Sequence, residues 1–271
     1  MRYETLFDGR KIPVIGLGTW NIGGGMTPDY SSDGENVEAI QNAIRMGYTH
    51  IDTAQMYGAG HTEELVGRAI QPFKREELFI TTKVWSSHLR ETDVLREVEA
   101  SLGRLGLSFI DLLLIHWPNP AIPLEETFRA FNKLVSIGTV RYVGVSNFSV
   151  AQLVEAKYFS HVPIATNQVE YNLLHREPEL DGILRYCQEN SVLLTAYEPL
   201  GKGSILQHRG LKTFAGRYNI TIAQLAISWL LQKPKVITIP KSTKEKHLRE
   251  NLEVLRLTLP TQAFEEMNTL G

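Results

Sequence analysis

The sequence of 271 residues lacks several features that would each place it in a particular class of protein. It has one cysteine, Cys187, which excludes an internal disulfide and a cysteine-based metal site, and we expect this thiol to be buried. Its 28 basic residues are balanced by 30 acidic ones, and this net charge of −2 argues against nucleic-acid binding. No uncharged apolar run approaches the ~18 residues that a membrane span needs. The first residues carry no signal-peptide core, so a cytoplasmic location is expected.

Common nucleotide-binding and catalytic motifs are also missing. The turn Gly16-Leu-Gly18-Thr-Trp-Asn21 has Asn where the dinucleotide fingerprint Gly-x-Gly-x-x-Gly needs its third glycine, and no Gly-x₄-Gly-Lys-Ser/Thr loop occurs. Ser146 lacks the Gly-x-Ser-x-Gly context of a hydrolase nucleophile. There is no His-Glu-x-x-His pair, and of the eight histidines only His116 falls at the end of an expected strand. We therefore expect no metal site.

The sequence does contain a regular alternation of short apolar runs and amphipathic segments, after a hairpin that turns at Asp8-Gly9. The expected strands are Val14–Thr19, Thr49–Asp52, Leu78–Lys83, Ile110–His116, Val140–Ser146, Ala165–Val169, Val192–Ala196 and Val236–Ile239. The expected helices are Glu35–Met46, Glu63–Ile70, Asp93–Leu105, Glu125–Ile137, Val150–Tyr158, Pro178–Glu189, Ile222–Leu231 and Gln262–Asn268. The segment Leu200–Gly210 is expected to be a long loop. Repeated βα units predict an α/β (β/α)₈ TIM barrel in one domain, residues 1–271, with an open doubly wound sheet as the alternative.

Polar side chains stand where one expected strand after another ends. They are Asp52, Lys83, His116, Ser146 with Asn147, Gln168, Tyr197, and Lys241 with Ser242. In a barrel these strand ends open on one face, so residues distant in sequence meet there. Seven such ends in chain order are difficult to explain by packing alone. They predict an active site on that face.

Asp52, Tyr57 and Lys83 together suggest proton transfer. A tyrosine has a reference pKa of about 10, and a neighbouring ammonium lowers the pKa by stabilising the tyrosinate. A carboxylate beside the ammonium would hold it charged and oriented. Tyr57 would then be a general acid, while His116 could donate a hydrogen bond to a carbonyl oxygen. A structural Asp52–Lys83 ion pair with an exposed Tyr57 is the alternative.

At these residues the sequence closely resembles the aldo-keto reductase family over essentially its whole length. The landmarks are Gly16-Leu-Gly-Thr-Trp20, Gly47-Tyr-Thr-His-Ile-Asp-Thr-Ala54 with Tyr57-Gly58, Lys83-Val-Trp85, Asp111-Leu-Leu-Leu-Ile-His-Trp-Pro118, Gly144-Val-Ser-Asn-Phe148, Asn167-Gln168 and Ile239-Pro-Lys-Ser242 with Glu250-Asn251. The resemblance implies a barrel that binds NADPH without a Rossmann fold and transfers hydride to an aldehyde or ketone, with Tyr57 as proton donor.

The resemblance also assigns binding residues. The implied cofactor contacts are Thr19, Trp20, Asp52, Ser146, Asn147, Gln168, Tyr197, Leu200, Gly201, Lys241, Ser242, Thr243, His247, Glu250 and Asn251. The implied substrate contacts are Trp20, Tyr57, Trp85, His116 and Trp117, whereas Trp229 is expected to pack between helices and barrel.

Three positions depart from the family pattern. His247 replaces the usual Arg, so a preference for NADPH over NADH rests mainly on Lys241. Glu198 replaces a small hydroxyl residue, and its carboxylate would repel a pyrophosphate unless it turns away. Gln55 stands where Glu is frequent.

Two other functions remain open on the same barrel. Lys83 could act as the nucleophile of a Schiff-base lyase, although a neighbouring Asp52 favours the charged ammonium. A non-enzymatic nucleotide-binding subunit could instead use bound NADPH as a redox sensor. We expect a monomer, with small-molecule carbonyl compounds as its partners. The chain ends at Gly271 soon after its last helix, which suggests an open pocket and broad carbonyl acceptance.

Overall fold

The parallel strands of this computed structural model, which describes residues 2–270, form one sheet in the order β3 to β10. They are β3 (Leu17–Gly18), β4 (His50–Asp52), β5 (Phe79–Val84), β6 (Ile110–Ile115), β7 (Val140–Ser146), β8 (Ile164–Glu170), β9 (Leu193–Tyr197) and β10 (Val236–Thr238). Ile15 pairs with Thr238, and the Gly16 N–H donates to the Thr238 carbonyl at 2.8 Å. The first strand therefore meets the last, and the sheet closes into the expected barrel.

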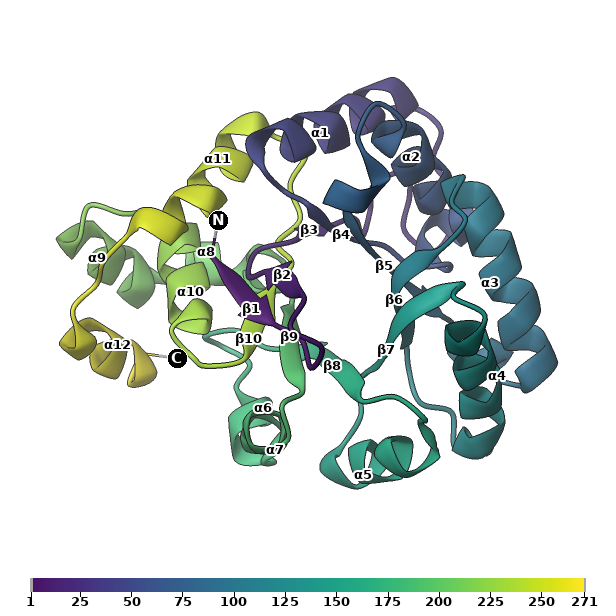
Figure 1. Cartoon of the computed structure of the whole chain (residues 1–271). Coiled ribbons are helices and arrows are strands. Elements are labelled where there is room, and N and C mark those ends of the chain that lie inside the picture. The colour runs from purple at the N-terminus through teal and green to yellow at the C-terminus, as the bar shows by residue number, and fades with distance from the viewer. Residues whose placement is uncertain (1, 271) are drawn as a thin grey trace.

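Helices surround the ring of strands (Figure 1). They are α1 (Asp33–Met46), α2 (His61–Ile70), α3 (Glu91–Leu105), α4 (Leu124–Ser136), α5 (Val150–Phe159), α6 (Glu177–Leu180), α7 (Ile183–Glu189), α8 (Ser204–Gln207), α9 (Arg209–Arg217), α10 (Ile222–Leu231), α11 (Glu245–Glu253) and α12 (Thr261–Asn268). Short 3₁₀ turns are η1 (Tyr57–Gly60), η2 (Arg75–Glu77), η3 (Ser86–His88), η4 (Gly201–Gly203) and η5 (Val254–Arg256). Among residues 2–270, none of the helices has the length and apolar character needed to span a bilayer.

Apolar packing on both faces of the strands explains their composition. Every residue of β5 and β6 is buried, as expected where helices cover one face and the barrel interior the other. Trp229 on α10 is fully buried in the helical shell, and its indole N–H donates to Asn268 at 2.8 Å. Cys187 on α7 is also buried. Both placements agree with the sequence-based expectations.

Three local predictions were wrong. The run Val14–Thr19 is regular only at β3, because the chain pairs with β10 at Ile15 before it pairs with β4. The expected helix Pro178–Glu189 divides into α6 and α7 at Gly182, whose φ of 81° is left-handed. The segment Leu200–Gly210 holds η4 and α8, and it runs into α9 rather than forming one loop.

The N-terminal hairpin, β1 (Tyr3–Thr5) paired with β2 (Lys11–Pro13), lies across one end of the barrel (Figure 1). Arg10 of the hairpin pairs with Asp111 at the start of β6, at 3.1 Å. Asp111 is fully buried, and it also pairs with Arg75 at 2.6 Å and Arg141 at 3.0 Å. One carboxylate thus joins the hairpin to η2, β6 and β7 at the amino ends of the strands. The opposite end remains available for a functional site.

Replacing Asp111 with Asn should destabilise the protein, because it leaves three guanidinium groups facing a neutral amide. Breaking a buried ion pair costs roughly 3–5 kcal/mol, and the partial exposure of the arginines reduces this to about 2–4 kcal/mol. The free energy of unfolding in urea measures the change. Asp93→Asn, which removes a surface partner of Arg96, is the control and should have little effect. Equal stability of the two variants would contradict the structural role of Asp111.

Candidate active site

The polar residues that follow successive strands meet at the end of the barrel opposite the hairpin. Asp52 ends β4 and Lys83 lies next to the end of β5, and their side chains form an ion pair at 2.5 Å. Gln168 on β8, 116 residues after Asp52, donates its amide to the other oxygen of the Asp52 carboxylate at 2.8 Å. Asp52, Lys83 and Gln168 therefore converge as the sequence predicts.

The Lys83 ammonium has an acceptor for each of its three N–H groups. It donates to the Asp52 carboxylate at 2.5 Å, to the Thr53 carbonyl at 2.9 Å and to the Tyr57 hydroxyl at 3.2 Å. Lys83 is only 1% exposed, so bulk water does not compete for these hydrogen bonds. Burial lowers the pKa of Lys83, but Asp52 and Tyr57 together outweigh burial, and the pKa is raised. The site therefore contains a permanent, oriented cation beside a phenol.

The pKa of Tyr57 differs from the sequence-based expectation. Burial raises the pKa of its phenol, and Lys83, although it acts in the lowering direction, does not overcome burial. The prediction of a lowered pKa was wrong because it considered the cation and not the desolvation that accompanies it. Tyr57 consequently keeps its proton at neutral pH and can donate it.

An unusual backbone turn holds Tyr57 over the cation. Gly58, Ala59 and Gly60 follow with φ values of 56°, 51° and 98°, all left-handed, although Ala59 is not a glycine. The Gly58 N–H donates to the Gly25 carbonyl at 2.6 Å. Strained backbone of this kind persists only where its surroundings enforce it, and it is concentrated at functional sites.

Glu63 and Arg104, which the sequence analysis did not single out, support this turn. The Arg104 side chain covers Gly60 so closely that a Cβ there would come within 2.8 Å of it. Arg104 donates to the fully buried Glu63 at 2.7 Å, and Glu63 accepts from Thr82, the neighbour of Lys83, at 2.6 Å. The available signal was a glutamate placed just before the apolar residues Leu65 and Val66 in the first half of α2.

Aromatic rings surround the Tyr57 phenol. Trp20 meets the Tyr57 ring edge to face at 4.9 Å, and His116 meets it at 5.7 Å between ring centroids. Trp85 contacts the other side of His116 at 5.1 Å. Trp117, 43% exposed, lies further out. Burial and the Lys83 charge lower the pKa of His116 to about 2, so its ring is neutral.

Amide and hydroxyl groups lie beside this aromatic cluster. Asn147 donates to the His116 carbonyl at 3.2 Å and to Ser146 at 3.0 Å, and its side-chain oxygen accepts from the Tyr197 hydroxyl at 3.0 Å. Ser146 donates to the Gln168 main-chain carbonyl at 2.8 Å. The expected nicotinamide residues are therefore joined in one network next to Asp52. Thr19, also an expected cofactor contact, is fully buried, and its hydroxyl donates to the Asp52 carbonyl at 2.9 Å.

Comparison with known proteins agrees with this geometry. Residues 14–271 match the model of the aldo/keto reductase family. The chain belongs to this family. A solved thermostable aldo-keto reductase, Tm1743 in complex with the inhibitor epalrestat, is 51% identical over the full length of both chains, with a TM-score of 0.97.

Two further relatives are also reductases. An aldo-keto reductase from Klebsiella pneumoniae, solved in complex with NADPH, is 34% identical over 100% of this chain and 95% of its own, with a TM-score of 0.90. Glyoxal reductase from Bacillus subtilis is 36% identical over 98% of this chain and 91% of its own.

In this aldo-keto reductase the expected adenosine end of the site lies along the segment that leads into α11. Lys241, Thr243 and His247 are exposed, while the Ser242 hydroxyl accepts from the Lys244 N–H at 3.1 Å. Asn251 is buried within the helix packing. The segment presents a cation and two hydroxyl residues before the first turn of α11, an arrangement that suits a phosphate.

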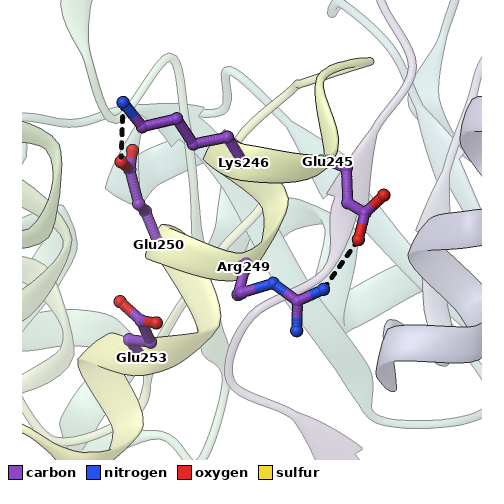
Figure 2. A pocket seen from close by; sticks show the side chains of 5 residues that line it. All are labelled: Glu245, Lys246, Arg249, Glu250 and Glu253. Atoms are coloured by element: carbon purple, nitrogen blue, oxygen red, sulfur yellow. Dashed lines mark hydrogen bonds and ion pairs between the residues drawn. The ribbon is translucent and has the colours of Figure 1, made fainter.

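The outer surface of α11 carries its own ion pairs (Figure 2). Arg249 pairs with Glu245 at 2.6 Å, and Lys246 lies 3.9 Å from Glu250. These residues and Glu253 line a shallow depression. Arg249 thus faces Glu245 on the outer surface of α11, two positions beyond the place where an arginine is usual in the family.

The Glu198 carboxylate forms an ion pair with Lys202. Glu198 follows β9 with a left-handed φ of 51°, and its carboxylate lies 3.2 Å from the ammonium of Lys202 on η4. Leu200 and Gly201 lie between them, and the Gly201 N–H donates to the Glu198 carbonyl at 2.9 Å. The pair balances the negative charge that the sequence analysis identified as unfavourable for a pyrophosphate.

The neutrality of His116 gives a direct test. Because burial and Lys83 hold its pKa near 2, the ring nitrogens should show the ¹⁵N chemical shifts of a neutral imidazole from about pH 8 down to about pH 4. NMR of labelled protein measures this, and His116→Gln assigns the signal. A His116 signal that titrates above about pH 5 would contradict the electrostatic description of the site.

Proposed function

We propose that this chain reduces aldehyde and ketone carbonyls with a reduced nicotinamide cofactor, NADPH in preference to NADH, and that Tyr57 supplies the proton. One observation carries the proposal: the fully engaged Lys83 ammonium bridges Asp52 and the protonated Tyr57 phenol, beside the rings of Trp20 and His116. Such an arrangement can deliver a proton to an oxygen and stabilise the anion left behind. The family relationship supports the same reaction class.

The residues beside Tyr57 fit a nicotinamide. Its carboxamide needs both donors and acceptors, which Ser146, Asn147 and Gln168 offer together, and Tyr197 adds an aromatic ring next to them. The bound cofactor would supply a hydride to the carbonyl carbon. At the other end, Lys241, Ser242 and Thr243 would hold a phosphate group.

Tyr57 and Lys83 would complete the reduction. The Tyr57 hydroxyl gives its proton to the carbonyl oxygen, so hydride and proton together convert the carbonyl to an alcohol. The tyrosinate that remains lies 3.2 Å from the Lys83 nitrogen. At an effective dielectric constant of about 20, that attraction is worth about 5 kcal/mol. Asp52 keeps Lys83 charged, and neutral His116 can donate its one N–H to the same carbonyl oxygen.

The engagement of Lys83 argues against the Schiff-base lyase. An amine attacks a carbonyl only with a free lone pair, which requires loss of a proton. All three N–H groups of Lys83 are donated, and its pKa is raised. This lysine therefore supports proton transfer rather than nucleophilic attack.

Tyr57→Phe should abolish carbonyl reduction while NADPH still binds, because only the proton donor is removed. A loss of about 10³-fold or more in kcat is expected, with the cofactor Kd changed less than about two-fold. Steady-state kinetics and fluorescence titration with NADPH give the two values. Retained turnover would refute the assignment of Tyr57. The same assay on the unaltered protein tests the redox-sensor alternative, which predicts no turnover.

Lys241→Ala should reduce the preference for NADPH, because it removes the cation expected at the 2′-phosphate. We expect the KM for NADPH to rise about ten-fold and that for NADH to change less than about two-fold. Lys246→Ala, which removes a lysine facing Glu250, is the matched control. If both cofactors lost affinity equally, Lys241 would not determine the preference.

A further inference from the structure

Gln55 is a buried polar residue of the Asp52–Tyr57 segment, and its side chain takes no part in the proposed proton transfer. It is 8% exposed, and its backbone N–H donates to the Lys83 carbonyl at 3.3 Å. Its side chain points away from Lys83 toward η3 and α3. There it contacts Trp85, His88 and Glu97.

Every polar atom of the Gln55 amide is used. The amide oxygen accepts the backbone N–H of Trp85 at 3.0 Å. The amide nitrogen donates to the Glu97 carboxylate on α3, and it lies 3.1 Å from Nδ1 of His88. The network fixes the orientation of the amide. A flipped amide would place its NH₂ against the Trp85 N–H and its oxygen against the Glu97 carboxylate.

These contacts require an amide rather than a carboxylate. The Trp85 N–H needs an acceptor, whereas the Glu97 carboxylate needs a donor. The Gln55 amide supplies both, and an ionised carboxylate supplies acceptors alone. A glutamate at position 55 would bring two carboxylates together within hydrogen-bond distance. Arg96, which pairs with Glu97 at 3.0 Å, and His88, whose Nδ1 is 4.0 Å from Glu97, are the charged or titratable groups nearest to that contact.

Gln55 thereby connects the segment that contains the proton donor, Tyr57, to Trp85. The backbone N–H of Trp85 contacts Gln55. The indole ring of Trp85 lies against the His116 ring, with 5.1 Å between the ring centroids. We propose that Gln55 is a positioning residue that sets the distance between Tyr57 and the Trp85 indole. It would thereby determine how aromatic carbonyl substrates fit beside His116. This inference rests on the proposed function.

The test uses a side-chain swap between positions 55 and 97. Gln55→Glu should raise the KM for 4-nitrobenzaldehyde about ten-fold, because repulsion by Glu97 displaces the Trp85 indole. The KM for propanal, which is too small to need that ring, and kcat for both aldehydes should change less than about two-fold. In the double variant Gln55→Glu/Glu97→Gln the amide lies on α3 and again donates to a carboxylate. Its KM for 4-nitrobenzaldehyde should return to within about two-fold of the starting value.

Gln188→Glu is a matched control, since it makes the same chemical change where the amide donates to the Pro234 carbonyl, far from the pocket. It should leave both KM values unchanged. If Gln55→Glu does not fold, Gln55→Met removes the donor and the acceptor without adding charge, and should raise the KM for 4-nitrobenzaldehyde about three-fold.

An unchanged KM in the position 55 variant, or equal impairment of the single and double variants, would overturn the role of Gln55. The unaltered protein and Tyr57→Phe separate this failure from failure of the proposed function. If Tyr57→Phe is inactive while Gln55→Glu is normal, only the inference about Gln55 is wrong. Failure of the unaltered protein to reduce either aldehyde would instead remove the function on which the inference rests, whereas turnover by Tyr57→Phe would refute only the assignment of Tyr57.

Discussion

The buried ammonium of Lys83 is the constraint on which the rest of the site depends. A charge removed from water is tolerated only when it is paired and all its hydrogen-bonding groups are satisfied. Asp52, Thr53 and Tyr57 meet that requirement, and all three belong to one short segment of chain. The requirement therefore fixes how β4 and the turn after it lie against β5. The side-chain amide of Gln168, on β8, donates a hydrogen bond to the other carboxylate oxygen of Asp52.

The barrel makes this arrangement available because adjacent parallel strands end side by side. Asp52 is in register with Thr81, so Lys83 lies two residues beyond it on the neighbouring strand and its long side chain reaches the carboxylate. The opposite end of the barrel is covered by the hairpin and tied through Asp111. Stability and chemistry are thus assigned to opposite ends of the same strands, as in other barrels of this type.

Most of the strands, and the strand-end residues Asp52, Lys83 and His116, could be predicted because both depend on local pattern. A strand ending in Asp, Lys or His can be recognised without knowing the fold around it. The helix α9 was missed although Leu211, Phe214 and Ala215 lie on one face, because Gly210 in its first turn is a residue that disfavours helices. The pKa direction of Tyr57 and the contacts of Gln55 could not be predicted, since burial and the distance between α3 and β5 arise only in the folded chain.

The division of roles between Lys83 and His116 follows from their shared environment. Each group lies in the same desolvated pocket, and the positive charge of one lowers the pKa of the other. Only one of them can remain charged, and the adjacent Asp52 decides that it is the lysine. The histidine is left neutral, so it can orient a carbonyl oxygen without offering the anion a second cation. Negative charge that develops on the phenol oxygen is then stabilised mainly by Lys83, the group that already holds that oxygen in place.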